Sequence, residues 1–156
     1  MAKRPTTRVA TKSTETESAP VADSELLPIA QAAAALCLDK KATDPVILHV
    51  EKLTSYTDFF VIASAPSERQ VAAVASHVEE QLKKAGFRTL GVEGKSTGNW
   101  VLLDYGDFVI HVFLDDARSY YDIEGFWSDA PRIEVDEKFG LEILANIEAQ
   151  QEKLSA

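Results

Sequence analysis

Near each end of the predicted domain, the pattern of apolar residues predicts a helix. Residues 26–38 (LLPIAQAAAALCL) are Ala-rich and apolar, which predicts a helix that ends before Asp39 and contains Cys37 as a buried small side chain. Residues 139–154 are weakly amphipathic, with Leu144, Ile147 and Leu154 spaced loosely along one side. This second helix is expected either to cover the domain or to form a mobile appendage.

The clearest amphipathic helix is predicted between residues 67 and 85. Its apolar side chains form one stripe, whereas the opposite side carries Glu–Lys pairs four residues apart. Ser67 followed by Gln70 is a capping-box pattern at the start of the helix, and Gly86 ends it. The stripe consists of Val71, Val74, Ala75, Val78 and Leu82.

Three strands are predicted before the most informative region of the chain. They cover residues 46–50 (VILHV), residues 58–65 (DFFVIASA) and a short segment at residues 88–92. The second of these is continuously apolar rather than alternating, which is typical of a strand that is buried on both faces.

A β-hairpin is predicted from residues 99–105 and 108–114, joined by Gly106 and Asp107. Glycine at the first turn position favours a two-residue type II′ turn, because glycine alone adopts a positive φ there at low cost. The turn fixes the register of the two strands, and both faces of the hairpin are then largely apolar. The resulting pairs are Trp100 with Phe113 and Leu102 with His111 on one face, and Leu103 with Ile110 and Tyr105 with Phe108 on the other.

Two apolar faces on one hairpin have two interpretations. Helices of the chain itself cover both faces, or part of one face stays open and packs on a protein partner. Trp100 and Tyr105, close to Asp104 and Asp107, combine aromatic anchors with charge, as residues that dominate protein interfaces do. The hairpin also suits the edge of a sheet, where a strand of a partner can add.

The remaining pattern completes an α/β assignment. Residues 115–131 predict one or two short helices, with their aromatic side chains held against the sheet and Pro131 as their end. Helices and strands then alternate along most of the chain, which favours a single α/β domain with a mixed β-sheet flanked by helices. A length of 156 residues is enough for one such domain to bury a proper core.

The charge distribution excludes some functions. The net charge is −9, and residues 1–12 alone carry +4, so the remainder carries −13. This argues against direct sequence-specific nucleic-acid binding and against adhesion to anionic membranes, and it favours a basic partner. No apolar run reaches the roughly 20 residues that a membrane span needs.

Residues 1–23 are interpreted as a disordered basic tail, since they lack apolar periodicity. An acid-free start is also compatible with an organellar transit peptide, although the large apolar residues of such peptides are missing. Residues 133–156 are interpreted as an acidic helical extension of the domain.

A search for catalytic patterns finds little. The three histidines are not spaced as metal ligands, and a single cysteine excludes a Cys-based zinc site, so no cofactor is expected. Asp104 and Asp107 are the nearest approach to a carboxylate pair and allow one alternative, a nucleotidyltransferase-like enzyme that depends on a metal ion. Arg118 is expected to pair with a neighbouring acid. Another alternative is a homodimer that forms through the apolar face of the sheet.

Several motifs in this order resemble the ribosomal silencing factor family, also called the Iojap family. Each motif alone is weak, and the combination is specific. The resemblance covers roughly residues 26–132 and places the family domain at residues 24–132. The motifs are DFFVI from Asp58, SERQV from Ser67, WVLLDYGD from Trp100, HV from His111, RSYY from Arg118 and FWSDAPR from Phe126.

The resemblance implies an α/β fold similar to nucleotidyltransferases, with no recognised catalytic activity. It implies a factor that binds ribosomal protein L-fourteen (uL14) of the large subunit, blocks joining of the small subunit and represses translation, here in the bacterial cytoplasm. Mitochondrial relatives act in assembly of the large subunit. The family's contact surface matches Trp100, Asp104, Tyr105 and Asp107. Arg118, Tyr121 and Trp127 are added to the candidate site, although their motif also suits structural packing.

Overall fold

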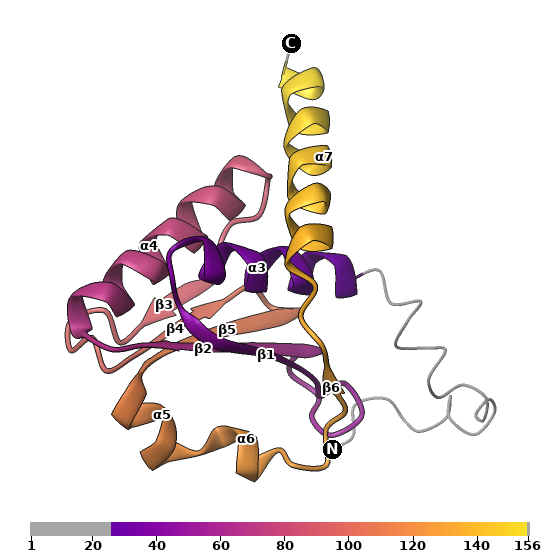
Figure 1. The fold of residues 1–156 in the computed structure, drawn as a ribbon. Helices are drawn as coiled ribbons and strands as arrows, with labels where there is room; N and C mark the ends of the chain where they lie inside the picture. Colours follow the sequence, from indigo (N-terminus) through magenta and orange to yellow (C-terminus); the bar gives the residue numbers. More distant parts are fainter. Residues whose placement is uncertain (1–25, 156) are drawn as a thin grey trace, which may run out of the picture.

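A six-stranded mixed sheet in the order β3-β4-β5-β2-β1-β6 forms the centre of the protein (Figure 1). The computed structural model describes residues 26–155. β2 and β5 are parallel, and every other neighbouring pair is antiparallel. The strands are β1 (Thr43–His49), β2 (Phe59–Ala65), β3 (Gly91–Glu93), β4 (Trp100–Asp104), β5 (Phe108–Leu114) and β6 (Arg132–Ile133).

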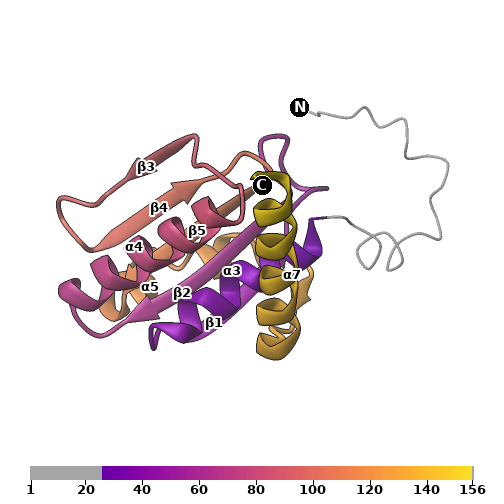
Figure 2. The same cartoon turned by 90° about the horizontal axis from the view of Figure 1, so that it is seen from above.

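Helices cover both faces of this sheet (Figures 1 and 2). On one face lie α3 (Leu27–Asp39), α4 (Glu68–Lys84) and α7 (Glu137–Ser155), and on the other lie the short helices α5 (Asp115–Tyr121) and α6 (Ile123–Phe126). All seven residues of β2 are buried, as expected for a strand between two helical layers. The predicted α/β domain with a mixed sheet flanked by helices is confirmed.

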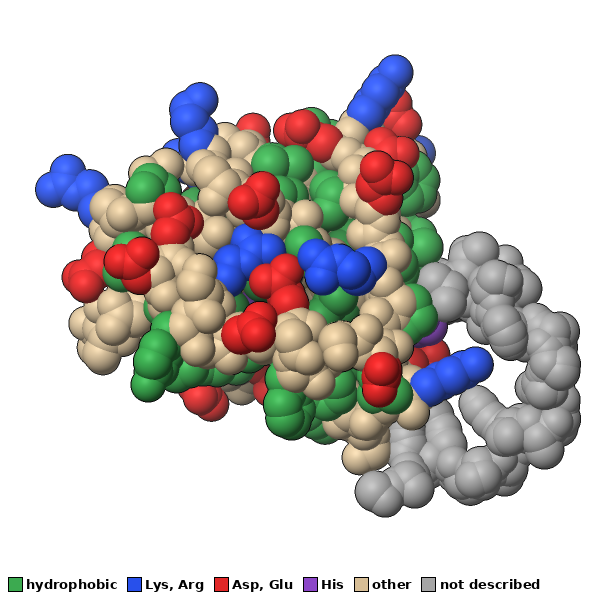
Figure 3. Space-filling view, turned by 60° about the horizontal axis from the view of Figure 1, so that its bottom comes forward, with side chains coloured by type: hydrophobic (Ala, Val, Ile, Leu, Met, Phe, Trp, Pro, Cys, Tyr) green, Lys and Arg blue, Asp and Glu red, His purple; other side chains and the backbone are tan. Residues whose placement is uncertain are grey.

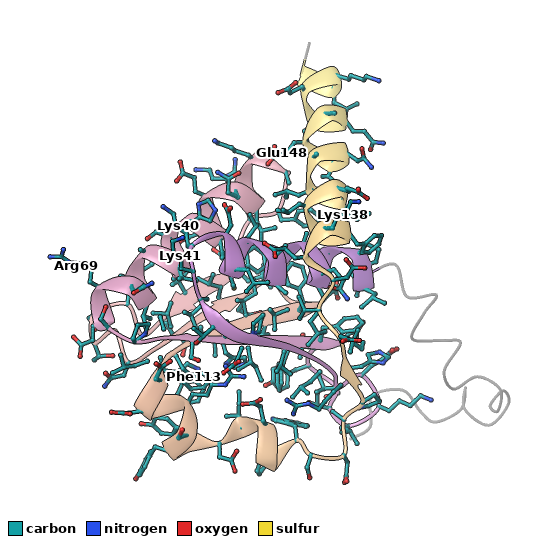
Figure 4. All side chains as sticks on the ribbon, viewed as in Figure 1. Lys40, Lys41, Arg69, Phe113, Lys138 and Glu148 are labelled. Atoms are coloured by element: carbon teal, nitrogen blue, oxygen red, sulfur yellow. The ribbon has the colours of Figure 1, made fainter. Side chains whose placement is uncertain are left out.

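The sequence pattern of α4 agrees with its observed limits. The Ser67 hydroxyl accepts a hydrogen bond from the Gln70 amide at 3.2 Å, and Gly86 follows the helix with a φ of +97°. The five residues of the predicted stripe are the buried residues of the helix. Arg69 extends from the first turn away from the body of the protein (Figure 4). Capping and burial therefore confirm the predicted helix.

The hairpin has the predicted register. Trp100 pairs with Phe113, Leu102 pairs with His111, and Gly106 in the turn has a φ of +85°. Because side chains alternate along a strand, this register decides which residues of β4 share a face.

The first half of the C-terminal helix α7 covers α3. Leu144 is buried in the core, whereas Leu154 is 80% exposed near the end of α7, which extends beyond the body of the domain (Figure 1). The buried Gln31 of α3 fixes the preceding segment: its amide nitrogen donates to the Glu134 carbonyl at 2.9 Å, and its amide oxygen accepts from the Asp136 amide at 2.7 Å. We expected this helix either to cover the domain or to form a mobile appendage. Its first half covers the domain.

Some expected boundaries differ from the structure. The strand expected at residues 88–92 is found at Gly91–Glu93, and β6 was not expected at all, because two residues after Pro131 give no periodic pattern. The basic tail at residues 1–23 lies outside the described residues. Within residues 26–155, no helix is both long and apolar enough to cross a membrane.

Candidate functional site

Strand β4 presents two unlike faces. Val101 and Leu103 are buried under α4, whereas Trp100, Leu102 and Asp104 alternate with them and stay partly exposed on the α5 side. The short helices α5 and α6 cover the other side of the sheet without fully covering β4. We call this surface the β4 face, and its residues are Tyr56, Trp100, Leu102, Asp104 and Tyr121.

Trp100 is held on several sides although it is partly exposed. Its ring stacks on Phe113 of β5 with centroids 4.8 Å apart, and Tyr121 of α5 lies 4.9 Å away. Phe113 points to the α5 side of the sheet (Figure 4). The indole Nε1 donates a hydrogen bond to Nδ1 of His111 at 3.0 Å. The orientation of the indole is therefore fixed before any partner arrives.

His111, which accepts this hydrogen bond, is itself buried. Its side chain lies among Phe60, Phe113 and Trp100. Burial lowers the pKa of the imidazole from 6.5 to about 3, since the charged form cannot be solvated there. His111 is therefore neutral at physiological pH and keeps a lone pair on Nδ1.

The two turn carboxylates have separate environments. Asp104 accepts a hydrogen bond from the Gly106 amide at 2.8 Å, which closes the turn. Asp107 is exposed, and its carbonyl accepts a bond from the Asp58 amide at 2.9 Å. Residues 26–155 contain no group of three or more His, Cys, Asp or Glu side chains that could hold a metal ion.

Tyr105 lies on the face opposite to Trp100. Its ring is parallel to that of Phe108, with centroids 4.8 Å apart, and packs partly buried against the core under α4, to which Phe108 belongs. Burial, together with the nearby Glu79, raises the pKa of the Tyr105 phenol. Of the expected contact residues, the structure therefore separates Tyr105 from the surface that holds Trp100 and Asp104.

Tyr121 and Trp127 take different positions on the α5 side. Tyr121 is 50% exposed beside Trp100, so it belongs to the β4 face. Trp127 packs edge-on against Phe60 at 5.4 Å, within the smaller core between the sheet and α6. The expectation that all aromatic residues of this segment lie against the sheet is wrong for Tyr120 and Phe126, which are 81% and 80% exposed.

Arg118 forms the expected pair with an acid, at a distance from the β4 turn. Its Nε and Nη2 donate to the two Glu124 oxygens at 2.9 and 3.1 Å, and its Nη1 donates to Ser64 Oγ at 3.0 Å. Arg132 donates to the same carboxylate at 3.3 Å. Hydrogen bonds from Arg118 are the main reason why the pKa of Glu124 is lowered. These three charged residues line a cleft of about 780 Å³. Basic and acidic side chains lie next to each other on the face of the molecule that Figure 3 shows.

Tyr56 is the residue of this surface that the sequence pattern did not indicate. It is 62% exposed in the loop between β1 and β2, and its ring lies 6.3 Å from that of Phe60. Burial and the neighbouring Asp104 carboxylate raise its pKa. No periodic signal exists in a loop, so only the fold brings Tyr56 to Asp104.

Known proteins resemble this chain in both sequence and fold. A ribosomal silencing factor from Bacillus subtilis is 41% identical over 113 residues, which cover 72% of this chain and 94% of the relative. A mouse protein named mitochondrial assembly of ribosomal large subunit protein 1 is 31% identical over 96 residues, or 60% of this chain and 42% of the relative.

A crystal structure from Chromobacterium violaceum superposes with a TM-score of 0.65 at 42% identity, covering 67% of this chain and 88% of that chain. The family model described as "ribosomal silencing factor during starvation" matches residues 23–155. This match includes α7 as well as the sheet and the β4 face. The chain therefore belongs to the RsfS family of ribosomal silencing factors.

Proposed function

We propose that this chain binds the large ribosomal subunit through uL14, using the β4 face, and thereby sterically blocks joining of the small subunit and represses translation. The single observation that carries the proposal is the state of Trp100, which is partly exposed yet held by Phe113, Tyr121 and His111. A fixed aromatic side chain loses little conformational freedom on docking, which favours its use as an anchor.

The charges around this surface support a basic partner. Asp104 lies within the β4 face, Asp107 is exposed in the adjacent turn, and Asp115 and Asp116 begin α5 without burial. Ribosomal proteins are basic, so opposite charges would speed the encounter and restrict the orientation of the complex. Bulk alone then prevents subunit joining, and no catalytic residue is required. We place this activity in the bacterial cytoplasm, because identity to the Bacillus relative exceeds that to the mitochondrial one.

The direct test combines purified large and small subunits with the protein and separates the products on a sucrose gradient. Wild-type protein is expected to reduce the fraction of joined ribosomes and to sediment with the large subunit. Trp100→Ala is expected to lose both effects while it remains folded. Tyr105→Phe is the matched control, because it changes an aromatic residue on the opposite face and is expected to act as wild type.

Two results would contradict this proposal. Trp100→Ala that is folded and sediments fully with large subunits would show that the β4 face is not the contact. Wild-type protein that binds large subunits but leaves joining unchanged would contradict steric blocking. The second result would favour a role in large-subunit assembly, the role that the name of the mouse relative expresses.

A further inference from the structure

We propose that His111 is a positioning residue for docking, and that its Nδ1 holds the Trp100 indole in the orientation that the partner recognises. This inference rests on the proposed function, because it gives a role to a group behind the β4 face. His111 pairs directly with Leu102 in the hairpin, so Trp100 is its diagonal neighbour across the two strands. Diagonal positions are within reach of long side chains, and here Nε1 and Nδ1 are 3.0 Å apart.

The chemistry of the two rings determines the state of the histidine. The indole N–H can only donate, so Nδ1 of His111 must accept, and the proton of the neutral imidazole must lie on Nε2. A protonated imidazole would present a second donor to the indole and break the contact. Burial prevents this, because His111 is only 4% exposed and its pKa is lowered to about 3. The acceptor is therefore present throughout the physiological pH range.

The same arrangement lowers the stability of the fold. Nε2 of His111 is buried, and no hydrogen-bond acceptor lies within reach of it among residues 26–155. The ring of Phe60 stands perpendicular to the imidazole at 4.9 Å, which offers at most a weak N–H to ring contact. A buried donor without an acceptor lowers stability, and an apolar residue of similar size would avoid this. Stability alone therefore does not explain a histidine at this position.

His111 accepts a hydrogen bond from Trp100, which an apolar residue at this position could not do. Phe113 and Tyr121 restrict the indole by contact, but neither fixes which edge of the ring faces outward. The bond to His111 directs the N–H edge toward a buried residue, so that the partly exposed ring is held in one orientation. Without this bond, docking must restrict the rotation of the indole, which is expected to weaken binding by roughly two- to tenfold.

The experiment compares His111→Phe and His111→Leu, which remove the acceptor, with His111→Asn, whose side-chain oxygen can replace Nδ1. The first readout is the indole N–H signal in ¹⁵N-labelled protein. The chain has two tryptophans, so Trp127 supplies an internal reference. In the Phe and Leu variants we expect the Trp100 signal to shift and its hydrogen exchange to accelerate, whereas the Trp127 signal stays in place. In the Asn variant we expect slow exchange to be retained.

The second readout is the affinity for purified large subunits, measured beside the stability to urea. His111→Phe removes the unpaired Nε2 donor but leaves the indole N–H without its acceptor, so it is expected to stay close to wild-type stability and yet to bind roughly two- to tenfold more weakly. His111→Asn is expected to restore binding. A purely structural role would not produce weaker binding with unchanged stability. His49→Asn is the control, because it alters another buried histidine of the sheet, which stacks on Phe59 rather than on Trp100.

The outcomes separate this inference from the proposed function. If Trp100→Ala loses binding but folded His111→Phe and His111→Leu bind as wild type, the positioning role is overturned and the β4 face stands. If the loss of binding in every His111 variant follows its loss of stability, His111 is structural and the inference is also overturned. If Trp100→Ala binds as wild type, the proposed docking face itself fails, and the inference fails with it.

Discussion

Trp100 is the first residue of β4 and Tyr105 directly follows its last residue, yet their side chains lie on opposite faces of the sheet. Trp100 stacks on Phe113 and stays partly exposed on the α5 side, whereas Tyr105 is parallel to Phe108 and packs partly buried against the core under α4. Both residues belong to one sequence motif and to one expected contact surface. The structure places their side chains in different surroundings, because residues an odd number of positions apart along a strand point to opposite faces of the sheet.

Substitutions of Tyr105 are therefore expected to change stability rather than binding. Its hydroxyl is buried with no partner among the described residues, so Tyr105→Phe is expected to be neutral or slightly stabilising. Tyr105→Ala removes a partly buried ring that packs against the core and is expected to cost about 2 kcal/mol. Urea unfolding measures both changes. A fall in large-subunit affinity for Tyr105→Phe at unchanged stability would place this residue at the interface after all.

The Arg118–Glu124 pair is expected to depend on the shape of the guanidinium group. Two of its nitrogens hold the two oxygens of Glu124, and a third reaches Ser64. Lysine keeps the charge but cannot make this set of bonds, so Arg118→Lys is expected to destabilise the protein by roughly 2 kcal/mol. Thermal unfolding measures the loss. Lys95→Arg is a suitable control, since Lys95 forms a more exposed pair with Glu79, and it is expected to leave the unfolding temperature nearly unchanged.

The β4–β5 hairpin and the main helix could be predicted because their signals are local. The cap at Ser67, the stripe of α4 and the Gly106 turn each involve residues close in sequence, and the turn alone fixes the register of β4 and β5. That register also places Trp100 and Tyr105 on opposite faces. The expected contact set nevertheless included both, because the family motif records which residues recur and not which face each one occupies.

The rest of the candidate site depends on contacts between distant segments. Tyr56 comes from a loop without periodicity and reaches Asp104 only through the pairing of β2 with β5. Gln31 lies in an apolar run that predicts simple burial, yet it bonds to residues more than a hundred positions away. The exposure of Tyr120 and Phe126 depends on how far α5 and α6 extend over the sheet, which no residue pattern within them specifies.

The buried imidazole of His111 predicts a loss of stability in acid. Its pKa is about 3 in the folded protein and about 6.5 when exposed, so between these values the unfolded chain binds more protons. Stability is therefore expected to fall as pH falls from 6.5 towards 3, by up to about 1.4 kcal/mol per pH unit from this group. The lowered pKa of Glu124 acts in the same direction, at lower pH.

His111→Asn isolates the contribution of the imidazole to this pH dependence. Urea unfolding at pH 7, 6, 5 and 4 is expected to show that the stability difference between wild type and variant changes steadily, with the wild type losing more on acidification. The remaining carboxylates are common to both proteins and cancel in the difference. Parallel stability curves from pH 7 to pH 4 would contradict the buried, neutral state of His111.

Close contact between α7 and α3 is expected to depend on Gly140. This residue is buried, and a Cβ added there would overlap the Gln31 carbonyl and lie 3.0 Å from the Ala35 Cβ. Gly140→Ala should gain up to about 1 kcal/mol in helix propensity, but the overlap with backbone atoms is expected to outweigh this and give a net loss of about 1–3 kcal/mol. Gly91→Ala is the matched control, because a Cβ there meets nothing within 4 Å. Thermal unfolding and limited proteolysis of α7 measure the effect. A Gly140→Ala protein with unchanged unfolding temperature and an equally protected α7 would show that the two helices separate at little cost.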